Sequence, residues 1–314
     1  MSERYDIVIV GGGPAGLAAG LYSARMNLKT VLIDRGPLGG QLLNTELIED
    51  YPGFDSVLGA DLAIKMADHA RKFGLELREF EPVTEIVLEG DDRVVRLESG
   101  DELRAKAVIM AAGGLPRYLQ VPGESELAGR GVSYCAVCDG AFFREQELAV
   151  VGGGDAALEE GEFLTRYASK VYIIHRRSEF RAQPILQDRA RANPKIEFIM
   201  DARVQEIYGD AKVQGVRYES GGKIHDLKVG GVFIFIGFVP NSTLLKAHTE
   251  HDANGYLITD RDMKTSIEGV WAVGDVRSQL TKQIATAVGD GTTAAVSASQ
   301  YIDALKHRER AAVG

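Results

Sequence analysis

Residues 5–16 read YDIVIVGGGPAG, an apolar strand that runs directly into a glycine-rich turn. A helical stretch to about Met26 follows, and then a second strand, Thr30–Ile33, which ends at Asp34. Strand, glycine turn, helix, strand and acid form the order of a dinucleotide-binding unit. The glycines let the backbone approach a pyrophosphate, and the acid accepts a hydrogen bond from a ribose hydroxyl. This pattern predicts a Rossmann-like domain in the first part of the chain.

The same unit occurs a second time. The strand Leu148–Val151 runs into GGGDAA at residues 152–157, a helix reaches about Tyr167, and the strand Lys170–Ile174 ends at His175. The spacing from the third glycine to the residue after the second strand is equal in the two copies. The sequence therefore predicts an α/β protein with two Rossmann-like dinucleotide-binding domains.

The residue after the second strand differs between the copies. Asp34 in the first copy suits an unphosphorylated ribose, as in FAD. The second copy has His175, Arg176 and Arg177 there, with Arg181 four residues later. Guanidinium groups are the donors that a 2′-phosphate requires, so this copy is predicted to bind NADPH. The alternative for these arginines is ordinary solvated surface charge.

Between the two copies lie the only cysteines of the chain, Cys135 and Cys138, followed by Asp139. A dithiol at this spacing can close as a disulfide and reopen by thiolate exchange. A zinc site would need a second pair or a nearby histidine, and neither is present in the sequence around it. Two buried, inert cysteines are the remaining alternative. We favour a redox-active pair, because Val132–Tyr134 before it and Asp139–Gly140 after it look like a turn and not like a core strand.

Composition excludes other classes. With 314 residues the chain has room for two domains, and a formal net charge of −9 argues against a nucleic-acid partner. The longest apolar run, from Val232 to Val239 with Gly237 inside it, is too short for a membrane span. The first strand starts at Tyr5, which leaves no room for a signal peptide. We therefore expect a cytoplasmic protein with no membrane contact and no metal site, in which a disulfide is catalytic rather than structural.

The C-terminal part supplies a third element of the first domain. The segment 269–275 reads GVWAVGD, a short buried strand that closes on Gly274 and Asp275, and a helix rich in small residues is predicted from about Gln283 to Tyr301. Asp275 could accept from a flavin's ribityl chain, and the positive end of the helix could face the flavin ring. The alternative for the small residues is close helix packing, and Trp271 is predicted to lie in the core.

As a set, these motifs resemble the bacterial-type, low-molecular-weight thioredoxin reductases, which are class II pyridine nucleotide-disulfide oxidoreductases. The resemblance covers nearly the whole chain through GGGPAG, GGQL at residues 39–42, YPGF at 51–54, CAVCDG, GGGDAALEE, HRRxxxR, GDVR and QIATAVGDG. It implies a homodimer that reduces oxidised thioredoxin. It also implies an FAD domain made of residues 1–115 and 246–314, and an NADPH domain of residues 116–245 that carries the cysteines. The second domain would be inserted into the first, and both would have the three-layer ββα form.

The resemblance also implies roles for single residues. Cys138 would lie next to the flavin, Cys135 would attack thioredoxin, and Asp139 would donate or accept the proton. A helix N-cap is the alternative for Asp139. The inserted domain would rotate about two connections, near Gly113–Pro116 and near Thr243–Ala247, to present the dithiol and the nicotinamide in turn.

The resemblance implies two groups of cofactor contacts. For FAD they are Gly11, Gly13, Pro14, Ala15, Gly16, Asp34, Arg35, Gly40, Gln41, Asn44, Asp50, Val83, Ala111, Gly113, Gly274, Asp275, Lys282, Gln283 and Ile284. For NADPH they are Gly152, Gly154, Asp155, Ala156, Glu159, His175, Arg176, Arg177, Arg181 and Gly237. Four positions depart from the family pattern: Asp50 replaces a common Asn, Ala112 a Thr, Ala156 a Ser or Thr, and Lys282 an Arg.

Other functions remain open. A related flavoprotein could reduce another disulfide carrier, or work as a dithiol oxidase with oxygen, although the arginines argue against an enzyme that does not use NADPH. The same argument disfavours a ferredoxin-linked relative. A ferredoxin–NADP reductase of this fold would lack the cysteine pair. A nucleotide-sensing binding protein would keep both glycine motifs and need no dithiol.

Overall fold

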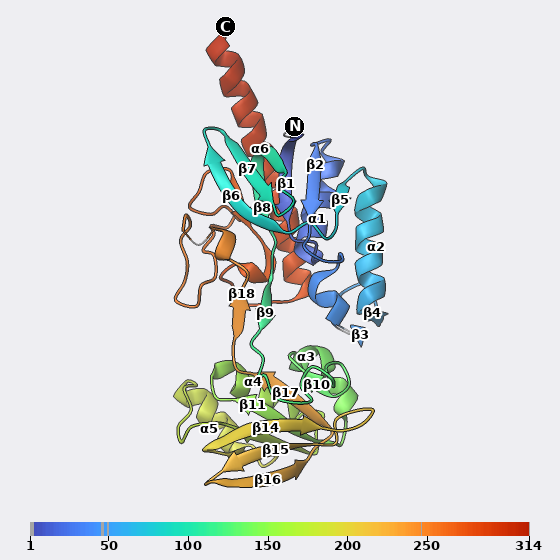
Figure 1. Cartoon of the computed structure of the whole chain (residues 1–314), viewed down its shortest axis with the longest axis vertical. Helices are drawn as coiled ribbons and strands as arrows, with labels where there is room; N and C mark the ends of the chain where they lie inside the picture. The colour runs from blue at the N-terminus through green and yellow to red at the C-terminus, as the bar shows by residue number, and fades with distance from the viewer. Residues whose placement is uncertain (1–2, 45–46, 49, 246, 314) are drawn as a thin grey trace. The chain divides into compact units, whose positions relative to one another are not determined.

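The computed structural model describes residues 3–44, 47–48, 50–245 and 247–313, and the chain divides into two compact units (Figure 1). Unit 1 comprises Met1–Glu46, Tyr51–Leu115 and Val239–Gly314, and unit 2 comprises Leu47–Asp50 and Pro116–Phe238. Each unit has its own sheet and its own core.

Unit 1 is built on a seven-stranded sheet in the order β5-β2-β1-β8-β7-β6, with β19 also paired to β8. Strands β1, β2, β5, β8 and β19 are parallel, whereas β6 and β7 are antiparallel. The central strands are runs of β-branched and aliphatic residues that are buried on both faces, as parallel strands require. Their bounds are β1 Glu3–Val10, β2 Thr30–Ile33, β5 Glu76–Arg78, β6 Val83–Glu89, β7 Asp92–Leu97, β8 Glu102–Met110 and β19 Val270–Ala272.

Two hydrophobic clusters cover the two faces of this sheet. On one face the helices α1 (Pro14–Arg25), α2 (Gly59–Lys72) and α6 (Ile284–Val313) pack over Ile7, Ile9 and the fully buried Trp271. On the other face β6, β7 and the segments after β18 (Phe238–Pro240) cover Val8 and Val31. Trp271 is a core residue, as predicted. Helix α6 does not end near Tyr301 but continues to Val313, because no glycine or proline interrupts the sequence after Tyr301.

Unit 2 has a parallel five-stranded sheet in the order β10-β17-β11-β12-β13 and an antiparallel sheet β14-β15-β16. One cluster of apolar residues lies between the two sheets, and a second lies between the parallel sheet and its helices. The three-layer ββα prediction is therefore confirmed for this unit. The strands are β10 Val132–Ser133, β11 Glu147–Gly152, β12 Lys170–Ile174, β13 Ile196–Ile199, β14 Ala202–Tyr208, β15 Gly215–Ser220, β16 Lys223–Lys228 and β17 Gly231–Phe235. The helices are α3 Ala136–Asp139, α4 Asp155–Leu164 and α5 Pro184–Ala192.

The chain passes from one unit to the other through β9 (Gly114–Pro116) and returns through β18 (Phe238–Pro240), and these two strands pair with each other. The chain thus returns to unit 1 earlier than predicted. The predicted end of the second domain was residue 245. The reason is that η3 (Thr243–Leu245) already belongs to unit 1, where Leu245 is buried beside Tyr5 and Val8. The second predicted hinge segment, Thr243–Ala247, therefore begins within unit 1.

Short elements complete the chain: η1 (Gly40–Asn44), β3 (Leu47–Ile48), β4 (Val57–Leu58), η2 (Gly140–Phe143) and η4 (Gly274–Val276). The two strand–turn–helix–strand units inferred from the sequence are β1-α1-β2 and β11-α4-β12, both parallel. No helix within the described residues is long and apolar enough to cross a membrane.

Candidate functional site

In unit 1 the carboxyl ends of four parallel strands meet at one edge of the sheet. Gly11 follows β1, Asp34 follows β2, Ala111 follows β8, and Gly274 lies just beyond β19. This edge is where open α/β sheets bind ligands. The fold therefore brings together residues that the sequence places far apart.

The first glycine turn leaves no room for side chains. Gly11 has a φ of 114°, and a Cβ on it would lie 2.3 Å from the carbonyl oxygen of Ala111. A Cβ on Gly16 would lie 1.9 Å from the carbonyl oxygen of Gly11, so helix α1 can approach the turn only without a side chain there. Gly13 is the N-cap of α1 and Pro14 is its first residue. The free amides at this helix end point out of the turn, as a pyrophosphate site requires.

Asp34 ties the end of β2 to this turn. Its Oδ2 accepts from the amide of Gly12 at 2.6 Å, and its Oδ1 accepts from the amide of Gly36 at 2.8 Å. Each carboxylate oxygen keeps a further acceptor site, so the group can still accept from a ribose hydroxyl. Arg35, the next residue, is exposed.

A second segment closes over the turn. A Cβ on Gly40 would lie 3.1 Å from the Cα of Gly13, and the side-chain amide of Gln41 donates to the carbonyl of Gly114 at 2.9 Å. Gly113, which has a φ of 59°, precedes that carbonyl. Of the other predicted contacts, Val83 begins β6 and Asp50 is exposed, while the side chain of Asn44 lies outside the described residues.

The turn after β19 carries Asp275, whose side chain is partly buried. Burial raises the pKa of Asp275, helped by Asp290 and opposed by Lys282. Its carboxylate makes no hydrogen bond to the described residues. Lys282 does not pair with that carboxylate; its Nζ donates to the carbonyls of Asp275 at 3.0 Å and Arg277 at 3.1 Å and lies 3.9 Å from the centre of the Tyr256 ring. Burial lowers the pKa of Lys282, although Asp275 opposes that effect.

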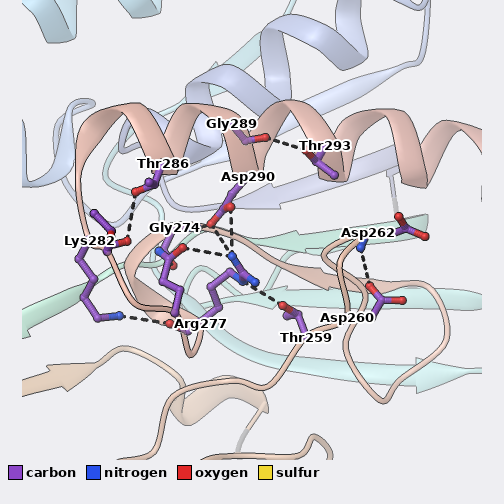
Figure 2. Close-up of polar contacts among 12 residues, drawn as sticks. Thr259, Asp260, Asp262, Gly274, Arg277, Lys282, Thr286, Gly289, Asp290 and Thr293 are labelled. Carbon is purple, nitrogen blue, oxygen red and sulfur yellow. Dashed lines mark hydrogen bonds and ion pairs between the residues drawn. The ribbon is translucent and has the colours of Figure 1, made fainter. Parts of the chain in front are cut away.

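Sequence reasoning missed the ion pair that fixes this turn. Arg277 Nη1 lies 3.1 Å from Asp290 Oδ1, and Asp290 Oδ2 accepts from the amide of Gly274 at 3.1 Å (Figure 2). Arg277 Nε donates to Thr259 Oγ1 at 2.9 Å. Asp290 therefore ties α6 to the turn that carries Asp275. The only sign of this ion pair in the sequence was Asp290, an acid inside the small-residue helix. The interpretation of that helix as a packing element gave this acid no role.

Unit 2 repeats the arrangement at the edge of its own sheet. Gly152 ends β11, Gly154 is the N-cap of α4, and Asp155 accepts from the backbone and side-chain amides of Gln183 at 2.7 and 3.1 Å. Ala156 and Glu159 lie exposed on α4, and Gly237 follows β17 with a φ of 119°. The amides of the glycine turn again begin a helix.

His175 and the three arginines after β12 take different positions. The His175 ring is buried, lies where a Cβ on Gly153 would be 2.2 Å away, and stacks on Phe180. Its Nε2 donates to the carbonyl of Glu179, and burial lowers its pKa. Arg176, Arg177 and Arg181 are instead exposed and have no ion pair or side-chain hydrogen bond among the described residues. The Arg181 amide donates to the Gly153 carbonyl at 2.8 Å, which holds this segment beside the turn.

The cysteine pair lies at the same edge of unit 2, directly after β10. Cys135 and Cys138 form a disulfide across α3, and the amide of Cys138 donates to Cys135 Sγ at 3.2 Å. Both cysteines are partly exposed. The stretch before the pair, expected to be a turn, is the short strand β10, which pairs with β17. The sulfurs therefore lie at the carboxyl end of β10, in the same parallel sheet as β11, the strand that leads into the second glycine turn.

Asp139 ends α3 and does not act as a helix cap. It stands at the N-cap position of η2, but its side chain makes no capping hydrogen bond there. Its Oδ2 instead accepts from Ser133 Oγ at 2.6 Å. Ser133 was not among the predicted site residues, and nothing in its sequence context marks it.

Known proteins share this arrangement. Residues 5–291 match the family described as pyridine nucleotide-disulphide oxidoreductases. The chain is 48% identical to the thioredoxin reductase of Bacillus subtilis over 311 residues, which is 98% of each chain. It is also 48% identical to that of Listeria monocytogenes, over 96% of this chain and 95% of that one.

Solved structures of thioredoxin reductases are also similar to this chain. The thioredoxin reductase of Streptococcus pyogenes superposes with a TM-score of 0.91 at 48% identity, over 97% of this chain and all of that one. The thioredoxin reductase of Giardia duodenalis gives 0.90 at 35% identity, over 96% of this chain and all of that one. Both nucleotide turns and the cysteine pair lie inside the matched residues. The chain therefore belongs to the pyridine nucleotide-disulphide oxidoreductase family and, within it, to the thioredoxin reductases.

Proposed function

We propose that this protein reduces the disulfide of thioredoxin with electrons from NADPH, which pass through FAD to the Cys135–Cys138 disulfide. The observation that carries the proposal is the position of that disulfide. It lies at the end of β10, in the parallel sheet whose strand β11 leads into the second glycine turn. In this proposal the nicotinamide dinucleotide and the exchangeable disulfide share one unit.

The residues of unit 1 fit a flavin dinucleotide. The Gly11–Gly16 turn, which excludes side chains, would hold the pyrophosphate, and Asp34 would accept from the adenosine ribose. Asp275 is a partly buried carboxylate without a hydrogen bond in the described chain, and a ribityl hydroxyl would supply one. Gln283 and Ile284 stand at the start of α6, whose free amides favour negative charge. When bound, FAD supplies a two-electron carrier between nicotinamide and disulfide.

The residues of unit 2 fit a phosphorylated nucleotide. The turn at Gly152–Gly154 would hold the pyrophosphate against the start of α4. Arg176, Arg177 and Arg181 have no carboxylate partner among the described residues, so their charge is available to a 2′-phosphate. His175, which is buried against Gly153, supports the turn. These three arginines favour NADPH over NADH.

Thiol exchange then uses the two sulfurs in fixed roles. After two-electron reduction, the Cys135 thiolate would attack the partner's disulfide and form a mixed disulfide. Cys138 would then attack Cys135, which restores the internal disulfide and releases the partner as a dithiol. The amide of Cys138, which donates to Cys135 Sγ, favours the thiolate at Cys135 and supports this assignment. Asp139 would carry the proton between the thiols and solvent.

The wider assignments follow from the same family. We propose that unit 1 is the FAD domain, that unit 2 is the NADPH domain, that the protein is a cytoplasmic homodimer, and that its macromolecular partner is thioredoxin. Reduction of another disulfide carrier is the second candidate, because thiol exchange at Cys135 does not by itself select the partner. A dithiol oxidase is disfavoured by the three arginines, which it would not need.

Replacement of Cys138 by Ser tests the proposal. The variant should keep FAD, and NADPH should still bleach the flavin absorption, because neither nucleotide turn is changed. NADPH-dependent reduction of thioredoxin should fall to background, and a Cys135→Ser variant should behave in the same way. Measurable turnover by either variant would remove the pair from the mechanism. Wild-type protein that reduces other disulfide proteins faster than thioredoxin would support the second candidate.

A further inference from the structure

The hydroxyl of Ser133 lies at the centre of the redox site of unit 2. Ser133 is the last residue of β10 and is only 4% exposed. Its backbone is fixed by pairing with β17, where it lies opposite Phe233. A small polar side chain on a buried strand is hydrogen-bonded as a rule, and this one has three partners.

All three partners belong to the redox loop. The amide of Cys135 donates to Ser133 Oγ at 3.1 Å. The hydroxyl lies 2.6 Å from Asp139 Oδ2 and 3.2 Å from the carbonyl of Cys135. That carbonyl also accepts from the amide of Asp139 at 3.2 Å. Ser133, Cys135 and Asp139 therefore form a closed ring of hydrogen bonds around the disulfide loop.

A serine hydroxyl has one proton and two acceptor sites. With Asp139 ionised, the proton points to Oδ2, because that oxygen is nearer and charged. With Asp139 protonated, the same short contact reverses: the carboxyl group donates to Ser133 Oγ, and the serine proton turns to the carbonyl of Cys135. The amide of Cys135 donates to Ser133 Oγ in both cases, so no heavy atom has to move.

We propose that Ser133 is a positioning residue whose hydroxyl satisfies Asp139 in both of its protonation states and holds it in place beside the cysteine pair. The proposal rests on the proposed function, in which Asp139 moves the proton during thiol exchange. For each turnover Asp139 takes one proton from a thiol as it becomes a thiolate and gives it to the departing thiolate of the partner. Because the hydroxyl turns while the heavy atoms stay, the carboxyl group is ready for both transfers.

Other titratable groups surround this loop and would complicate a pH profile. Tyr134 donates to Glu124 at 3.0 Å beside β10, and burial raises the pKa of Tyr134. On the side of α4, burial raises the pKa of Glu160, and the ring of Tyr167 lies against Gly140. An effect of Ser133 can be assigned to Asp139 only if it disappears when Asp139 cannot ionise.

The experiment compares Ser133→Ala with Ser133→Thr, which keeps the hydroxyl. Ser133→Ala removes a donor to the carboxylate and so favours its protonated form. The midpoint of the pH dependence of thioredoxin reduction should move up by about one pH unit, so the rate at pH values below the wild-type midpoint should fall about tenfold. FAD content and flavin bleaching by NADPH should not change. Ser133→Thr should restore the wild-type profile.

Two controls and a second readout complete the design. Ser125→Ala removes an exposed hydroxyl that donates to Glu126 in the same unit, and it should change nothing. In an Asp139→Asn background, Ser133→Ala should add less than about a twofold change, since the two residues act as one unit. The alkylation rate of the dithiothreitol-reduced pair against pH, followed by mass spectrometry of the holoenzyme, should show the same shift as turnover.

Two results would overturn the proposal. One is a Ser133→Ala profile that coincides with wild type, and the other is a shift that persists in the Asp139→Asn background. Failure of the proposed function would look different, because wild-type protein itself would then not reduce thioredoxin with NADPH.

Discussion

Asp275 is the residue at which binding and stability oppose each other. Burial raises the pKa of its carboxyl group above the ordinary value of 3.8, so the folded chain holds that proton to higher pH than the unfolded chain does. The cost of ionising the buried group is absent below that ordinary value and grows as the pH rises through the raised pKa. Neutral pH lies well above the ordinary value, so this group destabilises the apoprotein there.

We therefore expect Asp275→Asn to stabilise the apoprotein at neutral pH, because the variant keeps the side-chain size and loses the charge. Melting temperatures of the two apoproteins, measured from about pH 4 to about pH 8, should separate as the pH rises and converge at the acid end. FAD affinity should fall, since the acceptor for the ribityl hydroxyl is weakened. A variant that is less stable at every pH would show that the carboxylate has an interaction that outweighs its burial.

Single residues differ in how far the sequence reveals them. Asp34, Arg176 and Arg177 were predicted because each stands at a fixed distance from a glycine turn, and the structure places them just after β2 and β12. The cysteines were predicted from their own spacing. Ser133 and Asp290 were not predicted. Their partners, Asp139 and Arg277, lie on other short elements, so the contacts exist only once β10 and α6 are in place. His175 was grouped with the arginines because its neighbours are basic, although its ring is buried.

Among the elements, α6 shows how two nearby glycines can have opposite effects. A Cβ on Gly291 would lie 2.1 Å from the carbonyl oxygen of Ala15 and 3.0 Å from the amide of Ala19, both on α1. A Cβ on Gly289 would meet no atom within 4 Å. The carbonyl of Gly289 accepts from Thr293 Oγ1, a contact that does not use a side chain at residue 289 (Figure 2). Gly291 is thus required for helix packing, and Gly289 is not.

Gly291→Ala should lower the free energy of unfolding by about 1–3 kcal/mol, because α1 and α6 must separate to admit the methyl group. Gly289→Ala should raise it by about 0.5–1 kcal/mol, because alanine is the better residue inside an exposed helix. Denaturant unfolding of the two variants beside wild type measures both values. Equal effects of the two substitutions would contradict the packing argument.

The elements themselves were predicted most securely where the pattern is local. Both glycine turns, their helices and their flanking strands follow from apolar runs and glycine spacing, and each is present. The point at which the chain passes from unit 2 back to unit 1 was predicted too late. In the sequence η3 looks like a connection, and only the burial of Leu245 assigns η3 to unit 1. The end of α6 was predicted too early, because the prediction followed the small residues, which stop near Tyr301. The residues after Tyr301 include several charged ones with high intrinsic helix propensity, so the helix continues.

The whole molecule consists of two units that each have their own core, so each nucleotide should stabilise mainly the unit that binds it. A ligand at a hundred times its Kd adds about 2.7 kcal/mol to the stability of its site. Amide hydrogen exchange, measured separately for peptides of each unit, shows which unit each nucleotide stabilises. FAD should protect peptides from β1 and α1, and NADP⁺ should protect peptides from β11 and α4.

Replacing Arg176 and Arg177 together by Gln should remove most of the NADP⁺ effect. Loss of charge-assisted hydrogen bonds to a phosphate costs about 2 kcal/mol, which is about a 30-fold weaker Kd. Protection by NAD⁺ at saturating concentration should be nearly unchanged, because NAD⁺ has no 2′-phosphate, and FAD protection should be the same as in wild type. Arg191→Gln, which removes an exposed guanidinium from α5 of the same unit, is the matched control. Equal loss of NAD⁺ and NADP⁺ protection would show that the arginines do not bind the 2′-phosphate. Protection of the Gly11–Gly16 turn by NADP⁺ would show that the nucleotide binds in unit 1.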